Sequence, residues 1–105
     1  MFLPPIEEVV KIYSKYVEQE DIDSANRFLA SVAAMAAYAA RAGLNPEEVR
    51  KYIDELREKI VEGPEMINPY VFGLLGDLIE DPTNIEAVKE RLRFIWSMDE
   101  LGLED

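Results

Sequence analysis

The chain contains neither cysteine nor histidine. Without cysteine it has no disulfide and no thiolate nucleophile, and without histidine no imidazole can act as a catalytic base. Zinc sites built from cysteine and histidine are excluded for the same reason. The composition therefore removes several common kinds of nucleophilic and zinc-dependent catalysis.

Basic residues are also scarce. Eleven Lys and Arg residues stand against 22 Asp and Glu residues, which gives a formal net charge of −11 over 105 residues. Nucleic acids and anionic membrane surfaces are bound through a local excess of Lys and Arg, and the densest basic stretch, Lys89 to Arg93, is interrupted by Glu90. We therefore expect no nucleic acid and no membrane as partner, whereas a basic protein surface would be attracted by this charge.

No segment has the pattern of a signal peptide or of a membrane span. Residues 1–5 carry neither a basic residue nor a long apolar run, and the longest apolar stretch, residues 28–42, is short and rich in alanine. We therefore expect a cytoplasmic protein. No stretch rich in Pro, Gly or Ser divides the chain, which predicts one helical domain over residues 1–98 and an acidic tail over residues 99–105.

Apolar residues recur at helical spacing along the chain, as at Ile6, Val9 and Tyr13. Gly43 is typical of a position just after a helix, and Asn45-Pro46 is typical of a helix start. The sequence therefore predicts an all-α fold, a single compact bundle of about five short, mainly antiparallel helices. They are expected near residues 5–17, 22–42, 46–62 and 69–80, with a fifth that starts at Asp81-Pro82 or at Thr83.

The second expected helix is apolar almost all round. Between residues 28 and 42 only Ser31 and Arg41 are polar. A helix of this kind belongs at the centre of a bundle, with neighbours on several sides. We expect it to be the most buried element.

Four carboxylates fall within the six residues 18–23 and raise the question of a metal site. The spacing does not fit a calcium loop, because the twelfth position counted from Asp21 is Val32 where a glutamate is required. Helix capping by Asp21 or Asp23 explains the acidic residues better. We expect no bound metal and no cofactor.

A second acidic group, Asp77, Glu80 and Asp81, lies near the end of the fourth expected helix. A carboxylate pair could carry out acid–base chemistry, but the spacing indicates no substrate cleft, and no histidine activates any serine. We therefore assign no catalytic residue. The nearby Gly73-x-x-Gly76 lacks the further residues of a phosphate loop, and we interpret it as a place where two helices pack closely.

The remaining signal is apolar surface. The fourth helix is apolar on nearly all sides, and the fifth has apolar residues away from its main stripe, so the domain has more apolar faces than a small bundle covers easily. After them comes an acidic tail that is typical of a disordered end, or of a docking segment anchored by two leucines. The candidate interaction residues are Phe72, Leu75, Phe94, Trp96, Met98, Leu101 and Leu103.

The leading hypothesis is a non-enzymatic module for protein–protein interaction or self-association. The expected partner is a second copy, forming a dimer, or another protein, which the charge suggests is basic. Two alternatives stay open. One is a small enzyme that depends on a carboxylate or a metal, and the other is an acidic mimic that occupies the basic surface of a nucleic-acid-binding protein.

Overall fold

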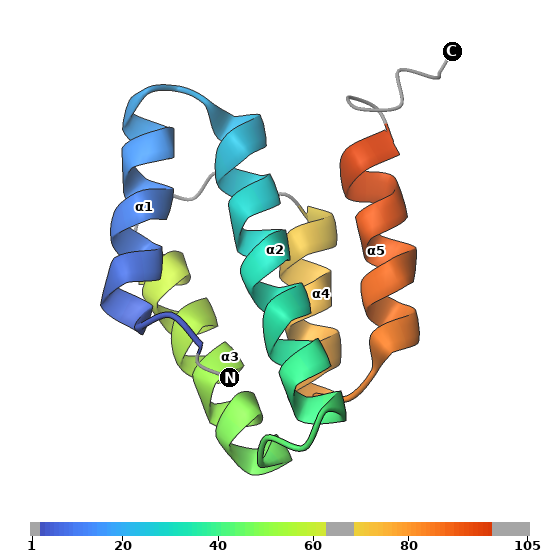
Figure 1. Cartoon of the computed structure of the whole chain (residues 1–105). Coiled ribbons are helices and arrows are strands. Elements are labelled where there is room, and N and C mark those ends of the chain that lie inside the picture. The colour runs from blue at the N-terminus through green and yellow to red at the C-terminus, as the bar shows by residue number, and fades with distance from the viewer. Residues whose placement is uncertain (1–2, 63–68, 98–105) are drawn as a thin grey trace.

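The computed structural model describes the backbone of residues 3–62 and 69–97, and the side chains of residues 3–60 and 69–95. These residues form five helices and no strand, and each helix runs antiparallel to the one before it (Figure 1). The all-α bundle predicted from the sequence is confirmed. The helices are α1 (Ile6–Glu18), α2 (Ile22–Arg41), α3 (Pro46–Glu62), α4 (Pro69–Glu80) and α5 (Ile85–Ser97).

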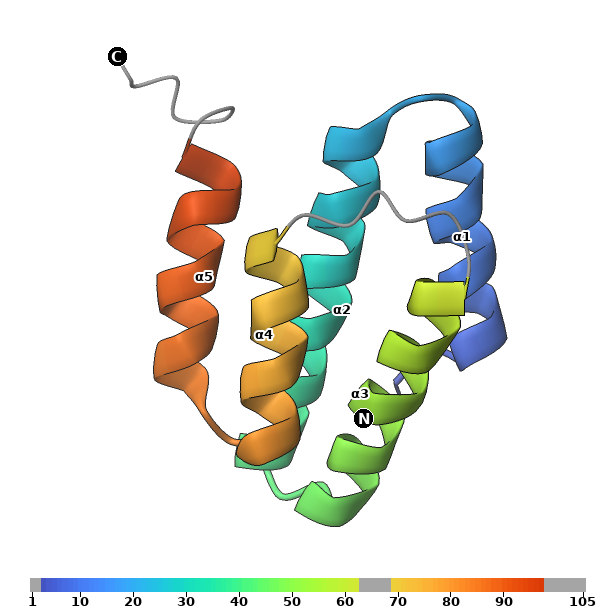
Figure 2. The ribbon, with the colours of Figure 1, turned by 180° about the vertical axis from the view of Figure 1, so that it is seen from behind.

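The helices form two layers. Helices α1, α2 and α5 lie in front in Figure 1, and α3 and α4 lie in front in the reverse view of Figure 2. Helix α2 contacts all four others, whereas α1 and α5 do not touch each other. The core is therefore built around α2, with Leu29, Ala33 and Ala36 completely buried.

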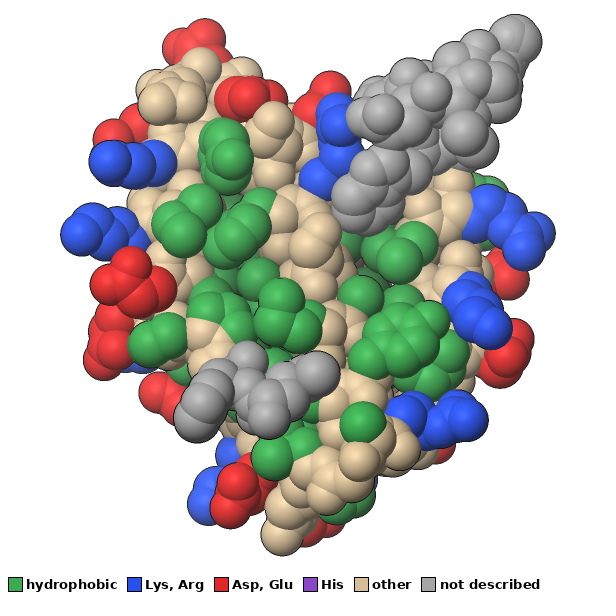
Figure 3. All heavy atoms as spheres, viewed as in Figure 1, with side chains coloured by type: hydrophobic (Ala, Val, Ile, Leu, Met, Phe, Trp, Pro, Cys, Tyr) green, Lys and Arg blue, Asp and Glu red, His purple; other side chains and the backbone are tan. Residues whose placement is uncertain are grey.

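Burial of α2 is less complete than its sequence predicts. Met35 is 40% exposed and Tyr38 is 48% exposed, and Phe28 is half-buried. Met35 and Tyr38 share one side of the helix with the exposed Ser31, whereas the ring of Phe28 lies 6.4 Å from the ring of Tyr16 on α1. Figure 3 shows hydrophobic side chains at the surface along this face. None of the described helices has both the length and the apolarity that a membrane span requires.

Helix ends follow local sequence signals. The Asp21 carboxylate accepts a hydrogen bond from the Ser24 amide at 3.2 Å, and the Asn45 side chain accepts one from the Glu47 amide at 2.8 Å, so both cap helices as predicted. Gly43 has a φ of 120°, a conformation that favours glycine. The start of α5 differs from the prediction, because Asn84 is its capping residue and accepts a hydrogen bond from the Ala87 amide.

Two polar side chains of α3 bond to distant parts of the backbone. The Tyr52 hydroxyl donates to the Pro4 carbonyl. Arg50 donates from Nε to the Ile79 carbonyl at 2.6 Å and from Nη2 to the Glu80 carbonyl at 3.3 Å. Arg50 thereby satisfies carbonyl groups that are left without helical partners at the end of α4. These bonds fix α3 against the N-terminal segment and against α4.

Because of Tyr52, the stability of the fold should fall as the pH rises through the alkaline range. Burial raises the pKa of Tyr52 from 10.0 to about 12. Between these values the folded chain keeps a proton that the unfolded chain has lost, so the free energy of unfolding falls as the pH rises. Urea unfolding across this interval is expected to show a smaller fall for Tyr52→Phe than for the wild type. The other tyrosines are present in both proteins, so an equal fall would show that Tyr52 is not the group responsible.

Candidate interaction surface

Helix α4 lies at the surface with one side in the core. Its buried residues are Val71, Leu74, Leu75 and Leu78, which recur at helical spacing. Leu75 is completely buried, and this corrects its assignment as an interaction residue. The first half of α4 has no charged residue to show which side faces inward, and the packing of α2, α3 and α5 against α4 decides it.

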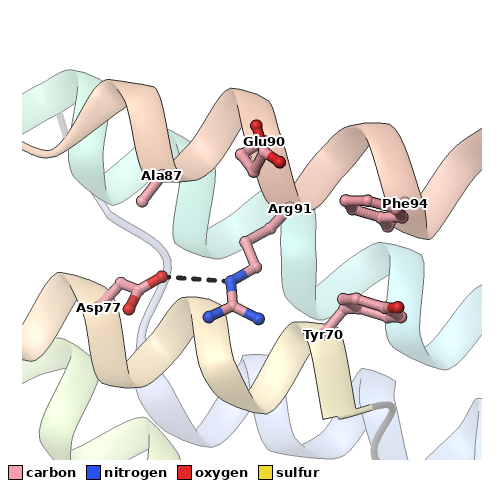
Figure 4. Close-up of a pocket in the computed structure, with 6 residues that line it drawn as sticks. All are labelled: Tyr70, Asp77, Ala87, Glu90, Arg91 and Phe94. Carbon is pink, nitrogen blue, oxygen red and sulfur yellow. Dashed lines mark hydrogen bonds and ion pairs between the residues drawn. The ribbon is translucent and has the colours of Figure 1, made fainter.

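The outer part of α4 carries exposed aromatic rings. Tyr70 is 42% exposed and Phe72 is 40% exposed, and on the neighbouring helix Phe94 is 45% exposed. The rings of Tyr70 and Phe94 stack across α4 and α5 with their centroids 5.0 Å apart and their planes 7° from parallel (Figure 4). We call these three rings, together with Gly76, the α4–α5 surface.

Next to the stacked rings, α4 and α5 enclose a groove of about 310 Å³. Arg91 reaches across it from α5, and its Nε lies 3.2 Å from Asp77 Oδ2 on α4 (Figure 4). Gly73 makes room for this side chain, because a β-carbon at that position would lie 2.5 Å from Arg91 Nη1. The ion pair therefore neutralises the one acidic residue that faces this groove from α4.

The second glycine of Gly73-x-x-Gly76 does not mark close helix packing within the bundle. A β-carbon at Gly76 would have no heavy atom within 4 Å. The interpretation of this motif as the meeting point of two helices of the chain is therefore wrong at Gly76. Instead, Gly76 leaves an open place on the side of α4 that faces away from the core.

Helix α4 itself carries few charges. Two of the twelve residues of α4 are charged, Asp77 and Glu80, and Asp77 is already paired with Arg91. In α3, which packs beside α4, ten of seventeen residues are charged. Exposed helices of soluble proteins normally resemble α3, so α4 has the composition of a helix that contacts something beyond its own domain.

The other candidate residues lie outside what the structure describes. Trp96 belongs to α5, but its side chain is not among those described, and Met98, Leu101 and Leu103 fall after the last described residue. Of the seven candidates, Phe72 and Phe94 are thus the two that the structure places on an exposed surface.

Sequence reasoning missed four exposed apolar residues. Ile12 lies on α1, Met35 and Tyr38 lie on α2, and Tyr70 lies on the α4–α5 surface. Ser31 could have indicated that Met35 and Tyr38 are exposed, because this polar residue falls on the same side of α2. Nothing in the sequence pairs Tyr70 with Phe94, since that contact depends on how α4 and α5 pack.

The acidic groups considered for catalysis have structural roles. Asp81 accepts hydrogen bonds from the Thr83 hydroxyl at 2.8 Å and from its amide at 3.1 Å, and these bonds lower the pKa of Asp81. A general acid needs the opposite shift. In the part of the chain that the structure describes, no three acidic side chains come close enough to hold a metal ion.

Comparison with known proteins gives this chain no relative: no family model, no curated protein and no solved structure matches it.

Proposed function

We propose that this protein is a non-enzymatic interaction module that forms a dimer through its α4–α5 surface. The observation that carries the proposal is the exposure of Tyr70, Phe72 and Phe94 on and beside α4, a helix with two charged residues, of which Asp77 is paired with Arg91. Aromatic rings of this kind contribute large contact area at protein interfaces and lose little side-chain entropy when they become buried.

The shape of α4 supports contact with a second copy. Tyr70 and Phe72 lie on opposite flanks of the helix, and between them runs the open side that contains Gly76. The open place at Gly76 lets another helix approach α4 closely, and two copies of α4 related by a twofold axis would each offer the same place. Twofold dimers are the commonest homo-oligomers, and they use one patch on both subunits.

The dimer is expected to tighten as salt concentration rises. Each chain carries a formal charge of −11, so two copies repel each other, and added salt screens that repulsion while it leaves apolar contacts intact. Light scattering after gel filtration at low and high salt measures this response. Phe72→Glu and Phe94→Glu should each give a monomer at both salt concentrations, because a carboxylate would have to be buried in the contact.

Met35→Glu is the matched control for these variants. Met35 is exposed to the same extent as Phe72, but it lies on α2 at the front of Figure 1, whereas α4 lies at the back. Met35→Glu should therefore form the wild-type dimer. Loss of the dimer in Met35→Glu alone would place the contact on the front face, and a wild-type monomer under every condition would reject self-association. A dimer that loosens with salt would indicate an interface held by ion pairs.

The acidic-mimic hypothesis receives no support from the face drawn in Figure 3. On the face drawn in Figure 3, acidic and basic side chains are interspersed around the edge. A mimic of a nucleic acid would need acidic residues gathered along one face.

A further inference from the structure

A second groove, between α2 and α5, has a different chemical character. It has a volume of about 270 Å³ and lies between the C-terminal half of α2 and the N-terminal half of α5. Its apolar part is the ring of Tyr38, which is 48% exposed, beside Ile85. The charged residues at this groove are Arg41, Glu86 and Lys89.

The cations at this groove are available for a ligand. Arg41 and Lys89 are both exposed, and neither makes a hydrogen bond or an ion pair in the described residues. By contrast, Arg50, Arg57 and Arg91 are each paired with a carboxylate on their own or a neighbouring helix.

Further basic residues lie along α2 and α5, the two helices that form the groove, at helical spacing from Arg41 and Lys89. Arg93 lies one turn after Lys89 on α5, and Arg27 lies on the side of α2 that carries Tyr38 and Arg41. Of the acidic residues on these two helices, Glu86 lines the groove, and Asp23 lies near the start of α2, four residues before Arg27. Basic side chains therefore outnumber acidic ones here, in a chain that has twice as many acidic as basic residues overall. Figure 3 shows Lys and Arg side chains bordering the α5 side of this face.

A ligand that fits this groove combines carboxylates with apolar side chains and has an extended backbone. The chain contains a segment with this composition immediately after α5 in the sequence. Residues 98–105, which follow α5 directly, carry four carboxylates together with Leu101 and Leu103.

The segment is long enough to reach the groove. Eight extended residues span about 26 Å. The thirteen residues of α5 rise by about 20 Å from one end to the other. A chain that turns back after Ser97 therefore reaches Lys89 and Arg41 without any movement of α5, and attachment to the same chain gives the segment a high effective concentration at the groove.

We propose that residues 98–105 bind in the α2–α5 groove of their own chain, with their carboxylates against Arg41, Lys89 and Arg93 and their leucines against Tyr38. Electrostatic attraction brings the acidic segment to the basic residues of the groove, and apolar contact of its leucines with Tyr38 then holds it there. This surface is separate from the α4–α5 surface, so it does not depend on the proposed dimer.

A spin label on the tail tests the contact directly. The chain has no cysteine, so Gly102→Cys gives one labelling position and leaves every carboxylate and leucine of the segment in place. In ¹⁵N-labelled protein, a nitroxide there should remove most of the amide signal of Tyr38, Arg41 and Lys89 at low salt, and high salt should restore it. Signals of α1, which does not touch α5, should keep their intensity. Broadening confined to the last turn of α5 and the start of α2 would overturn the proposal.

Reversing the charges at the groove tests the electrostatic basis of the proposal. Arg41→Glu combined with Lys89→Glu should abolish the broadening at Tyr38. The matched pair Lys11→Glu and Lys15→Glu, which makes the same change of charge on α1, should preserve it. If charge reversal at the groove has no effect on the broadening, the electrostatic basis of the proposal is wrong.

A mixed sample detects contact between chains. It contains ¹⁵N-labelled chain without the nitroxide and unlabelled chain with the nitroxide. Broadening in that sample would assign the groove to the tail of a second copy.

Discussion

Replacing Leu75 with alanine should lower the free energy of unfolding by about 2–5 kcal/mol. Leu75 is completely buried in the core, so the substitution removes apolar contacts and leaves a cavity that the surrounding helices fill only in part. Urea unfolding followed by circular dichroism measures the change. The effect is large compared with the total stability of a domain of this size, so the transition midpoint should move clearly.

Phe72→Ala is the matched control because it lies on the same helix and removes a larger side chain. Phe72 is 40% exposed, and we expect its removal to cost much less stability than the removal of Leu75 while it weakens the dimer. The concentration must be kept low enough for both proteins to be monomeric, because dimerisation itself stabilises the folded state. If Phe72→Ala destabilises the monomer as much as Leu75→Ala does, the outer side of α4 is packed rather than open.

Ala36→Leu should lower the free energy of unfolding by about 1–3 kcal/mol. Ala36 is completely buried on α2, the helix that contacts all the others, so three additional carbon atoms have no space there. Thermal unfolding at neutral pH measures the effect, and Ala33→Leu should behave in the same way because Ala33 is also completely buried.

Ser31→Leu serves as the control within the same helix. Ser31 is exposed, so a leucine at that position meets solvent and the stability should change by no more than about 0.5 kcal/mol. Equal losses at Ala36 and Ser31 would contradict the packing of α2. A gain in stability for Ala36→Leu would mean that the core holds a cavity next to that residue.

Local signals predicted most of the fold. Asp21, Gly43 and Asn45 mark helix boundaries through hydrogen bonds and backbone angles that involve only their immediate neighbours, and the structure has all three in these roles. The start of α5 was harder to place. Thr83 and Asn84 are both residues that cap helices, and Thr83 is occupied by its hydrogen bonds to Asp81.

The candidate surface was predicted only in part, for a physical reason. Phe72 and Leu75 are both large and apolar, and the charged residues of α4 come only after them, at Asp77 and Glu80, so periodicity did not separate the exposed ring from the buried one. The separation depends on how α4 packs against α2, α3 and α5, and the sequence of α4 alone does not show that packing. The α2–α5 groove was missed for the same reason, since Arg41 and Lys89 are brought together by packing alone.

The central position of α2 also determines how the molecule opens. Because α1 and α5 touch α2 but not each other, either one can detach and leave the rest of the bundle in contact. Amide protons of these two helices can then exchange with solvent through small, independent openings. The buried amides around Leu29 and Ala36 have no such route and exchange only when the whole chain unfolds. Their exchange rates therefore report the global stability of the domain, and those of α1 and α5 report two separate local equilibria.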